Sequence, residues 1–81
     1  MESITVELSY AGYIARLAGR ATERIELPGG STLQAVLEHV TARCGLTPTQ
    51  ARQVYLRVEG GMGTTLVDGD RVLVGVLIGG G

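Results

Sequence analysis

Residues 66–81 read LVDGDRVLVGVLIGGG, and this stretch decides the fold that the sequence predicts. It opens with a tight-turn signal at Asp68-Gly69-Asp70, because an Asp-Gly pair suits the positive φ of such turns. Residues 71–78 follow as a strand that is apolar on both faces, and a strand of that kind is usually central in its sheet. The sequence therefore predicts a central last strand that leads directly into Gly79-Gly80-Gly81.

Three further strands are predicted upstream of this one. Residues 4–10 alternate apolar and polar side chains, which is the period of two of a half-buried strand. Residues 22–27 favour a second strand that stops at a Pro-Gly-Gly turn, and residues 54–59 alternate as a third. The glycine-containing connections at 11–19 and 60–63 are expected to form a loop with room for one helical turn and a loose turn, respectively.

The clearest predicted helix covers residues 33–44. Its apolar side chains recur at helical spacing and share one face: Leu33, Val36, Leu37, Val40 and Cys44. Ser31 is the expected N-cap, with Gln34 completing a capping box, and Gly45 is placed to end the helix in the left-handed conformation. A second capping signal at residues 47–50 (TPTQ) predicts a short helix that follows directly.

The order of these elements is strand, strand, helix, short helix, strand, strand. The first two strands form a hairpin, and a last strand beside the first would run through the middle of a mixed sheet. This order predicts the β-grasp arrangement, an α+β fold with a mixed four- to five-stranded sheet and one main helix packed on one face. Residues 1–78 are assigned to this domain and residues 79–81 to a flexible glycine tail.

Composition excludes several classes of protein. A chain of 81 residues has room for one domain, and a net charge of −1 gives no basic footprint for nucleic acid or an anionic membrane. No apolar run would span a bilayer, and the first residues lack the features of a secretory signal. The single cysteine, Cys44, fits a reducing compartment. A cytoplasmic protein without nucleic-acid or membrane partners is expected.

Two side chains that often carry chemistry are assigned structural roles. Cys44 lies on the apolar face of the predicted helix without a histidine partner, and such a cysteine behaves as a small core hydrophobe. His39 lies off that face at no metal-ligand spacing, as expected of a solvated surface residue. The chain is therefore expected to bind no metal and no cofactor, and not to be an enzyme by itself.

The glycine tail suggests a different chemistry. Three consecutive glycines are poor material for a strand or a cap, because glycine costs entropy to order. A tail without side chains can thread a narrow channel and place Gly81 inside the active site of another protein. Its carboxylate is a poor electrophile, so ATP-dependent adenylation and then sulfide transfer to a thiocarboxylate would be catalysed by other proteins. The apolar residues beside the tail are the expected partner-binding patch: Leu73, Val76, Leu77 and Ile78.

Four segments resemble the MoaD/ThiS family of ubiquitin-like sulfur carriers. They are residues 4–10, residues 27–33 (LPGGSTL), residues 66–72 (LVDGDRV) and the terminal Gly80-Gly81. The resemblance implies a ubiquitin-like β-grasp fold and thiocarboxylation of Gly81. It also implies three partners: a ubiquitin-activating-type adenylating enzyme that uses ATP, a sulfur donor protein, and a larger synthase subunit. The length favours the small subunit of molybdopterin synthase, which serves molybdenum cofactor biosynthesis.

Several alternatives stay open. Alternative uses of the sulfur are thiamine, another sulfur-containing metabolite and tRNA thiolation. Gly81 is acylated either as it stands or after trimming. A ubiquitin-like protein modifier, joined through Gly81 to target lysines, shares the activation step. A non-covalent β-grasp binding module needs no activation. All seven basic residues are arginines, which reflects either composition bias or the avoidance of self-conjugation.

Overall fold

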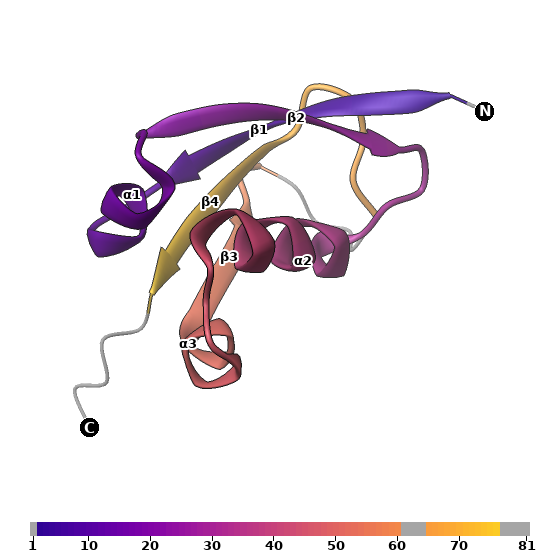
Figure 1. Ribbon diagram of the computed structural model, residues 1–81. Coiled ribbons are helices and arrows are strands. Elements are labelled where there is room, and N and C mark those ends of the chain that lie inside the picture. Colours follow the sequence, from indigo (N-terminus) through magenta and orange to yellow (C-terminus); the bar gives the residue numbers. More distant parts are fainter. Residues whose placement is uncertain (1, 61–64, 77–81) are drawn as a thin grey trace.

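The computed structural model describes residues 2–60 and 65–76 (Figure 1). In chain order its elements are β1 (Ser3–Tyr10), α1 (Tyr13–Ala18), β2 (Thr22–Pro28), α2 (Leu33–Cys44), α3 (Pro48–Gln53), β3 (Val54–Val58) and β4 (Arg71–Val76). The predicted tail at residues 79–81 and most of the predicted turn at residues 60–63 lie outside the described residues. In the described part of the chain, no helix is long and apolar enough to cross a membrane.

The strands form a mixed sheet in the order β2-β1-β4-β3. β1 and β2 form the predicted antiparallel hairpin, with Val6 opposite Ile25. β4 runs parallel to β1 on one side and antiparallel to β3 on the other. This confirms the predicted α+β fold and the central position of the last strand, because β4 is paired along both of its edges.

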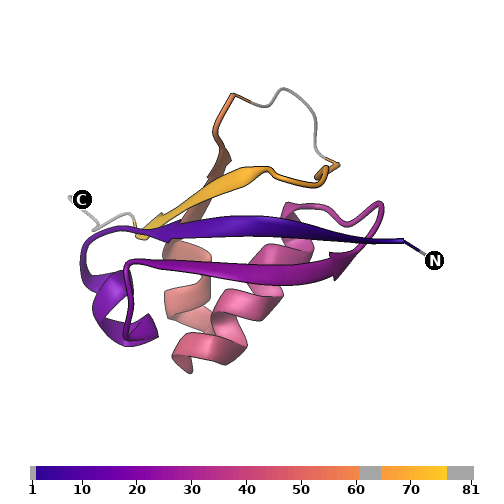
Figure 2. The ribbon, with the colours of Figure 1, turned by 90° about the horizontal axis from the view of Figure 1, so that it is seen from above.

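The core lies between the sheet and the helices. The three described helices lie on one side of the sheet (Figure 2). The other side, which no described helix covers, is called the open face below. The buried apolar residues are Val6, Leu8, Tyr10, Ile14, Ala18, Ile25, Val36, Val40, Leu66, Val72 and Val74. Each fully buried valine or leucine side chain contributes about 1.5–3 kcal/mol of transfer free energy. The pattern follows the period of two in β1 and β4, where alternate residues face the helices.

The start of α2 differs from the prediction. The N-cap is Thr32, not Ser31, and the Thr32 side chain makes no cap bond. The Ser31 hydroxyl does not cap the helix; it donates to the carbonyl oxygen of Pro28 at 2.7 Å. The Ser31 carbonyl accepts from the Leu66 amide at 2.8 Å, so a distant segment fixes this residue before the helix begins. The end of α2 is as predicted, with Gly45 at φ 64°.

The other two helices are short, and only one was predicted as a helix. α3 carries the predicted capping box, in which Thr47 and Gln50 exchange two bonds. α1 occupies the region expected to be a loop with a helical turn. Six residues are too few for a clear sequence period, but Ile14 is fully buried, and that packing accounts for the helix.

Candidate functional site at the end of the central strand

Gly81, which is predicted to react, lies outside the described residues. The tail residues Gly79 and Gly80 and the patch residues Leu77 and Ile78 also lie outside them. What the structure describes is the strand to which they are attached. β4 ends at Val76, between β1 and β3 in the middle of the sheet. Residues 77–81 are therefore connected to the end of a central strand, as the sequence predicted.

This end of β4 is held from both sides. The Val74 carbonyl accepts from the Ala11 amide at 2.9 Å, and Val76 pairs with Val54 of β3. α1 and α3 lie near the same end of the strand (Figure 1). They contact each other through Gln50 Nε2, which donates to the Tyr13 hydroxyl at 3.1 Å. The attachment point of residues 77–81 is thus a well-supported part of the fold.

The predicted partner patch is divided between the two faces of the sheet. Leu73 lies in one row with Ser9 and Arg57, on the open face, and is half-buried. Val76 packs against the helix-covered core. Residues three apart in a strand point to opposite faces, so Leu73 and Val76 cannot share one surface. A role of either residue in partner binding stays a prediction.

Tyr55 and Gly75 form a contact on the open face that the sequence did not reveal. They are directly opposite each other in the β3–β4 pair. A Cβ atom added to Gly75 would lie 2.5 Å from the Tyr55 ring, so the ring covers the glycine. The isolated glycine within the last strand was the available signal, since such a glycine often marks a close approach. Only the register identifies its partner.

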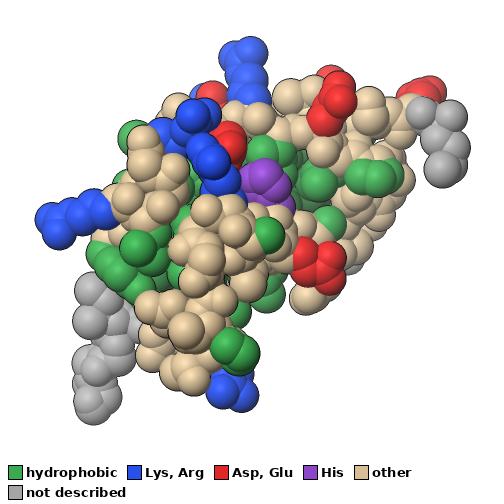
Figure 3. All heavy atoms as spheres, viewed as in Figure 1, with side chains coloured by type: hydrophobic (Ala, Val, Ile, Leu, Met, Phe, Trp, Pro, Cys, Tyr) green, Lys and Arg blue, Asp and Glu red, His purple; other side chains and the backbone are tan. Residues whose placement is uncertain are grey.

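A further group of exposed apolar side chains lies on α1. Tyr13 is 38% exposed and Leu17 is 40% exposed. Green apolar side chains gather in the space-filling view over the part of the surface where α1 lies (Figure 3). Exposed apolar side chains of α1, which contacts β4, therefore lie outside the predicted patch of Leu73, Val76, Leu77 and Ile78.

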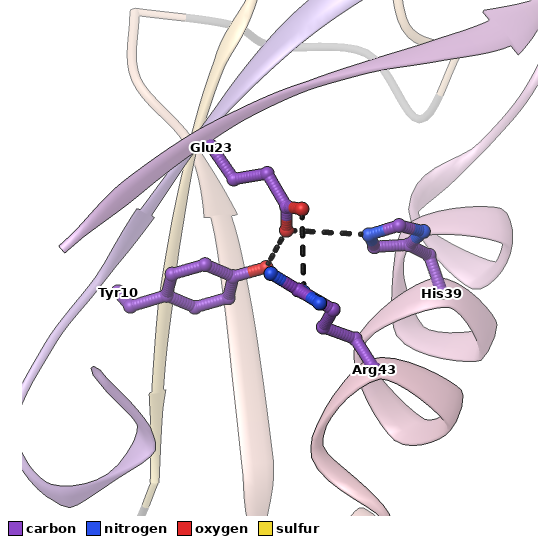
Figure 4. Close-up of polar contacts among 4 residues, drawn as sticks. All are labelled: Tyr10, Glu23, His39 and Arg43. Atoms are coloured by element: carbon purple, nitrogen blue, oxygen red, sulfur yellow. Dashed lines mark hydrogen bonds and ion pairs between the residues drawn. The ribbon is translucent and has the colours of Figure 1, made fainter. Parts of the chain in front are cut away.

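A polar cluster connects β2 to α2 on the covered side of the sheet (Figure 4). Glu23 Oε1 accepts from the Tyr10 hydroxyl at 2.7 Å and lies 3.4 Å from His39 Nε2. Its second oxygen lies 3.3 Å from Arg43 Nε. His39 is thus a contact between secondary-structure elements rather than a purely solvated residue, which corrects the prediction.

The pKa shifts in and beside this cluster are those of groups that stabilise the fold, not of a reactive group. Burial favours the neutral acid, but the bonds from Tyr10 and His39 and the charge of Arg43 outweigh it and hold the pKa of Glu23 below its usual range. Burial raises the pKa of the Cys44 thiol, so the thiolate that a nucleophile needs is disfavoured. Cys44 packs against the core, as expected.

A polar hollow of about 290 Å³ lies on the open face near the start of β4. It is lined by Thr5, Glu7, Arg24, Asp68, Gly69 and Arg71. Asp68 accepts from the Thr5 amide at 2.7 Å, and Arg71 Nε donates to Glu7 at 2.8 Å. The hollow lies near Arg71, at the start of β4, whereas residues 77–81 follow the opposite end of this strand.

No protein-family model and no curated protein matches the sequence. Solved structures do match. A Pyrococcus furiosus protein, provisionally assigned as molybdopterin converting factor, subunit 1, is 25% identical, with a TM-score of 0.75 over 93% of this chain and 99% of that chain. Small archaeal modifier protein 1 of Haloferax volcanii is 16% identical, with a TM-score of 0.72 over 93% and 99%. Caldiarchaeum subterraneum ubiquitin is 19% identical, with a TM-score of 0.67 over 99% and 100%. The fold is a ubiquitin-like β-grasp.

Proposed function

We propose that this chain, whose ubiquitin-like fold is of the MoaD/ThiS kind, is a sulfur carrier that acts through the carboxylate of Gly81. In this proposal Gly81 is the last residue of the active protein. It is adenylated, then thiocarboxylated, and it donates sulfur in molybdopterin biosynthesis. The similarity to the Pyrococcus furiosus protein assigned as molybdopterin converting factor, subunit 1, supports this pathway.

The observation that carries the proposal is the position of β4. This strand is central, and it is held on the β1 side up to Val74 and on the β3 side up to Val76. Five residues separate Val76 from the carboxylate of Gly81, and an extended segment of that length reaches about 17 Å. Residues 79–81 carry no side chains, so a partner with a narrow channel can receive them while the β-grasp body stays outside.

The chemistry divides into two steps. The Gly81 carboxylate attacks the α-phosphorus of ATP, which forms the acyl-adenylate and releases pyrophosphate. A sulfide equivalent from a sulfur donor protein then attacks the acyl carbon and displaces AMP, which leaves the thiocarboxylate. We assign adenylation to a ubiquitin-activating-type enzyme and use of the sulfur to a larger synthase subunit. The chain itself is the carrier and binds no cofactor in this scheme.

A second candidate function is protein modification. It is favoured by the similarity to small archaeal modifier protein 1 of Haloferax volcanii. It shares the acyl-adenylate but ends with the attack of a target lysine amine on the Gly81 acyl group. Because all seven basic residues are arginines, the chain offers no lysine side chain for self-conjugation. Sulfur transfer and modification are therefore distinguished by the acceptor.

Mass spectrometry of the intact protein tests the proposal. The chain is incubated with ATP, the activating enzyme of its own organism and a sulfur source. A sulfur carrier gains the mass difference between one sulfur and one oxygen atom, and fragmentation places the change on the last residue. Higher-mass, amine-linked adducts in cell extract would support modification instead. A chain that is neither adenylated nor altered in mass would leave only a non-covalent binding module.

A further inference from the structure

The open face of the sheet is polar along most of its length. β1 and β2 place the following residues on it: Thr5, Glu7, Ser9, Thr22, Arg24 and Glu26. The large apolar side chains that the described strands place there gather at one end, with Leu73 on β4 and Tyr55 on β3. This end of the open face is also the end at which β4 stops.

The Tyr55 ring is held in place before any partner binds. It fills the space above Gly75, where a Cβ atom would lie 2.5 Å from the ring. Gly75 is buried as a result, whereas Tyr55 remains 43% exposed. Aromatic rings placed across from a strand glycine stabilise the pair. A preordered tyrosine also loses little conformational entropy on binding, which is why such side chains are effective anchors at interfaces.

The length of the chain beyond this ring limits where a partner can lie. Gly75 precedes Gly81 by six residues, so an extended segment allows a separation of at most about 20 Å. An enzyme that holds the Gly81 carboxylate in its active site therefore has that site within about 20 Å of Gly75, which puts Tyr55 within reach of its surface. The ring is thus available to the protein that receives the tail.

The charge beside Tyr55 indicates the chemistry of that surface. Arg57 is exposed and shares the open face, in register with Leu73. Glu7 and Glu59 are engaged by Arg71, at 2.8 and 3.6 Å. Among the described residues, no carboxylate forms an ion pair with Arg57. An approaching partner would satisfy it with an acidic side chain.

We propose that Tyr55, seated on Gly75, is the docking anchor by which the adenylating enzyme recognises this chain. The enzyme would receive the ring in an apolar pocket and pair a carboxylate on its rim with Arg57. This inference rests on the proposed function, because it requires an enzyme that binds the tail. It adds a recognition residue that lies outside the tail and outside the sequence-based patch.

The test measures the Michaelis constant for the chain in ATP–pyrophosphate exchange by the activating enzyme. Tyr55→Ala should raise KM by about tenfold or more, as removal of an interface anchor does, and leave kcat nearly unchanged. Tyr55→Phe keeps the ring and should resemble the wild type. Val67→Ala is the matched control, since Val67 is 59% exposed but precedes the start of β4.

Gly75→Ala separates docking from stability. The added methyl group must displace the ring, because the nearest atoms are the far end of the Tyr55 side chain. Displacement of the ring removes its stabilising contact with Gly75, whereas alanine costs less backbone entropy than glycine in a strand. These two effects oppose each other, so the unfolding temperature of this variant should change little. Its KM should nevertheless rise as in Tyr55→Ala. A merely structural ring would lower the stability of Tyr55→Ala and leave KM unchanged in both variants.

The possible outcomes are distinct. If the wild-type chain is activated and both variants keep its KM, the docking inference is wrong and the carrier function stands. If the wild-type chain is never activated, the proposed function fails and the inference fails with it. Sedimentation of the wild type and of Tyr55→Ala tests whether a second copy of this chain binds the ring instead. A dimer that the substitution abolishes would assign the ring to that second copy and overturn the inference.

Discussion

The covered face and the open face of the sheet are built from alternate residues of the same strands. In β4, Val72 and Val74 are fully buried beneath the helices, whereas Arg71 is exposed and Leu73 is half-buried on the other side. In β1, Leu8 is fully buried, whereas Glu7 next to it forms an ion pair with Arg71 across the open face.

This difference indicates that the two faces of β4 have different roles. The covered face supplies the apolar burial that a domain of 81 residues needs. The open face is then free to carry charges and the Tyr55–Gly75 contact without loss of the core. β4 contributes side chains to both faces of the sheet. The strand that supplies buried core residues is therefore also the one to which residues 77–81 are attached.

Removal of Gly80 and Gly81 should have the largest effect, and it tests whether stability and the proposed reaction depend on different parts of the molecule. If stability comes from the covered face alone, the deletion should leave the thermal unfolding temperature unchanged. It should reduce thiocarboxylation below detection, because the proposed reacting carboxylate would be displaced by two residues. Circular dichroism measures the first effect, and intact mass after incubation with ATP, the activating enzyme and a sulfur source measures the second. Undiminished thiocarboxylation of the shortened chain would refute the assignment of Gly81.

The next largest effect concerns the core. Leu8→Ala removes a side chain with 0% exposure and should lower the free energy of unfolding by about 2–5 kcal/mol. Leu73→Ala is the matched change on the open face and should cost less than about 1 kcal/mol. Urea denaturation compares the two. Equal losses would mean that the open face contributes to the core after all.

Substitution of Glu23 tests the polar cluster on the covered side of the sheet. Because its native pKa is lowered, the carboxylate stabilises the fold above the unfolded pKa near 4.5, and this stabilisation is lost as the pH falls through the native pKa. Glu23→Gln should cost about 1–2 kcal/mol at pH 7 and less at pH 3. Urea unfolding at both pH values measures this. Glu26→Gln, on the open face of the same strand, is the matched control.

The smallest expected effect is on the open face itself. Arg71→Gln removes the contacts to Glu7 and Glu59, but the arginine side chain is 54% exposed. Exposed ion pairs contribute less than about 1 kcal/mol, and salt screens them. The loss should therefore be small at low ionic strength and smaller still in high salt. A loss as large as that of Leu8→Ala would contradict the proposed division between the two faces.

Local signals in the sequence predicted a large part of the fold. The capping box of α3, the glycine that ends α2 and the alternation of β1 all depend on residues within a few positions of one another. The central position of β4 was predicted because a strand that is apolar on both faces needs neighbours on both sides. The sequence also predicted that Gly81 reacts at the end of a glycine tail, and this stays a prediction because residues 79–81 lie outside the described residues.

The sequence by itself thus determined the order of elements, the apolar pattern of the strands and the glycines that follow the last strand. Only the tertiary structure decided which residues meet across the chain: Tyr55 with Gly75, Glu23 with His39 and Arg43, and Ser31 with Leu66. It also placed Leu73 and Val76 on opposite faces and made α1 a helix around the buried Ile14. The physical reason is that propensity and capping act between neighbours in the chain, whereas strand register and core packing are set by contacts between distant segments.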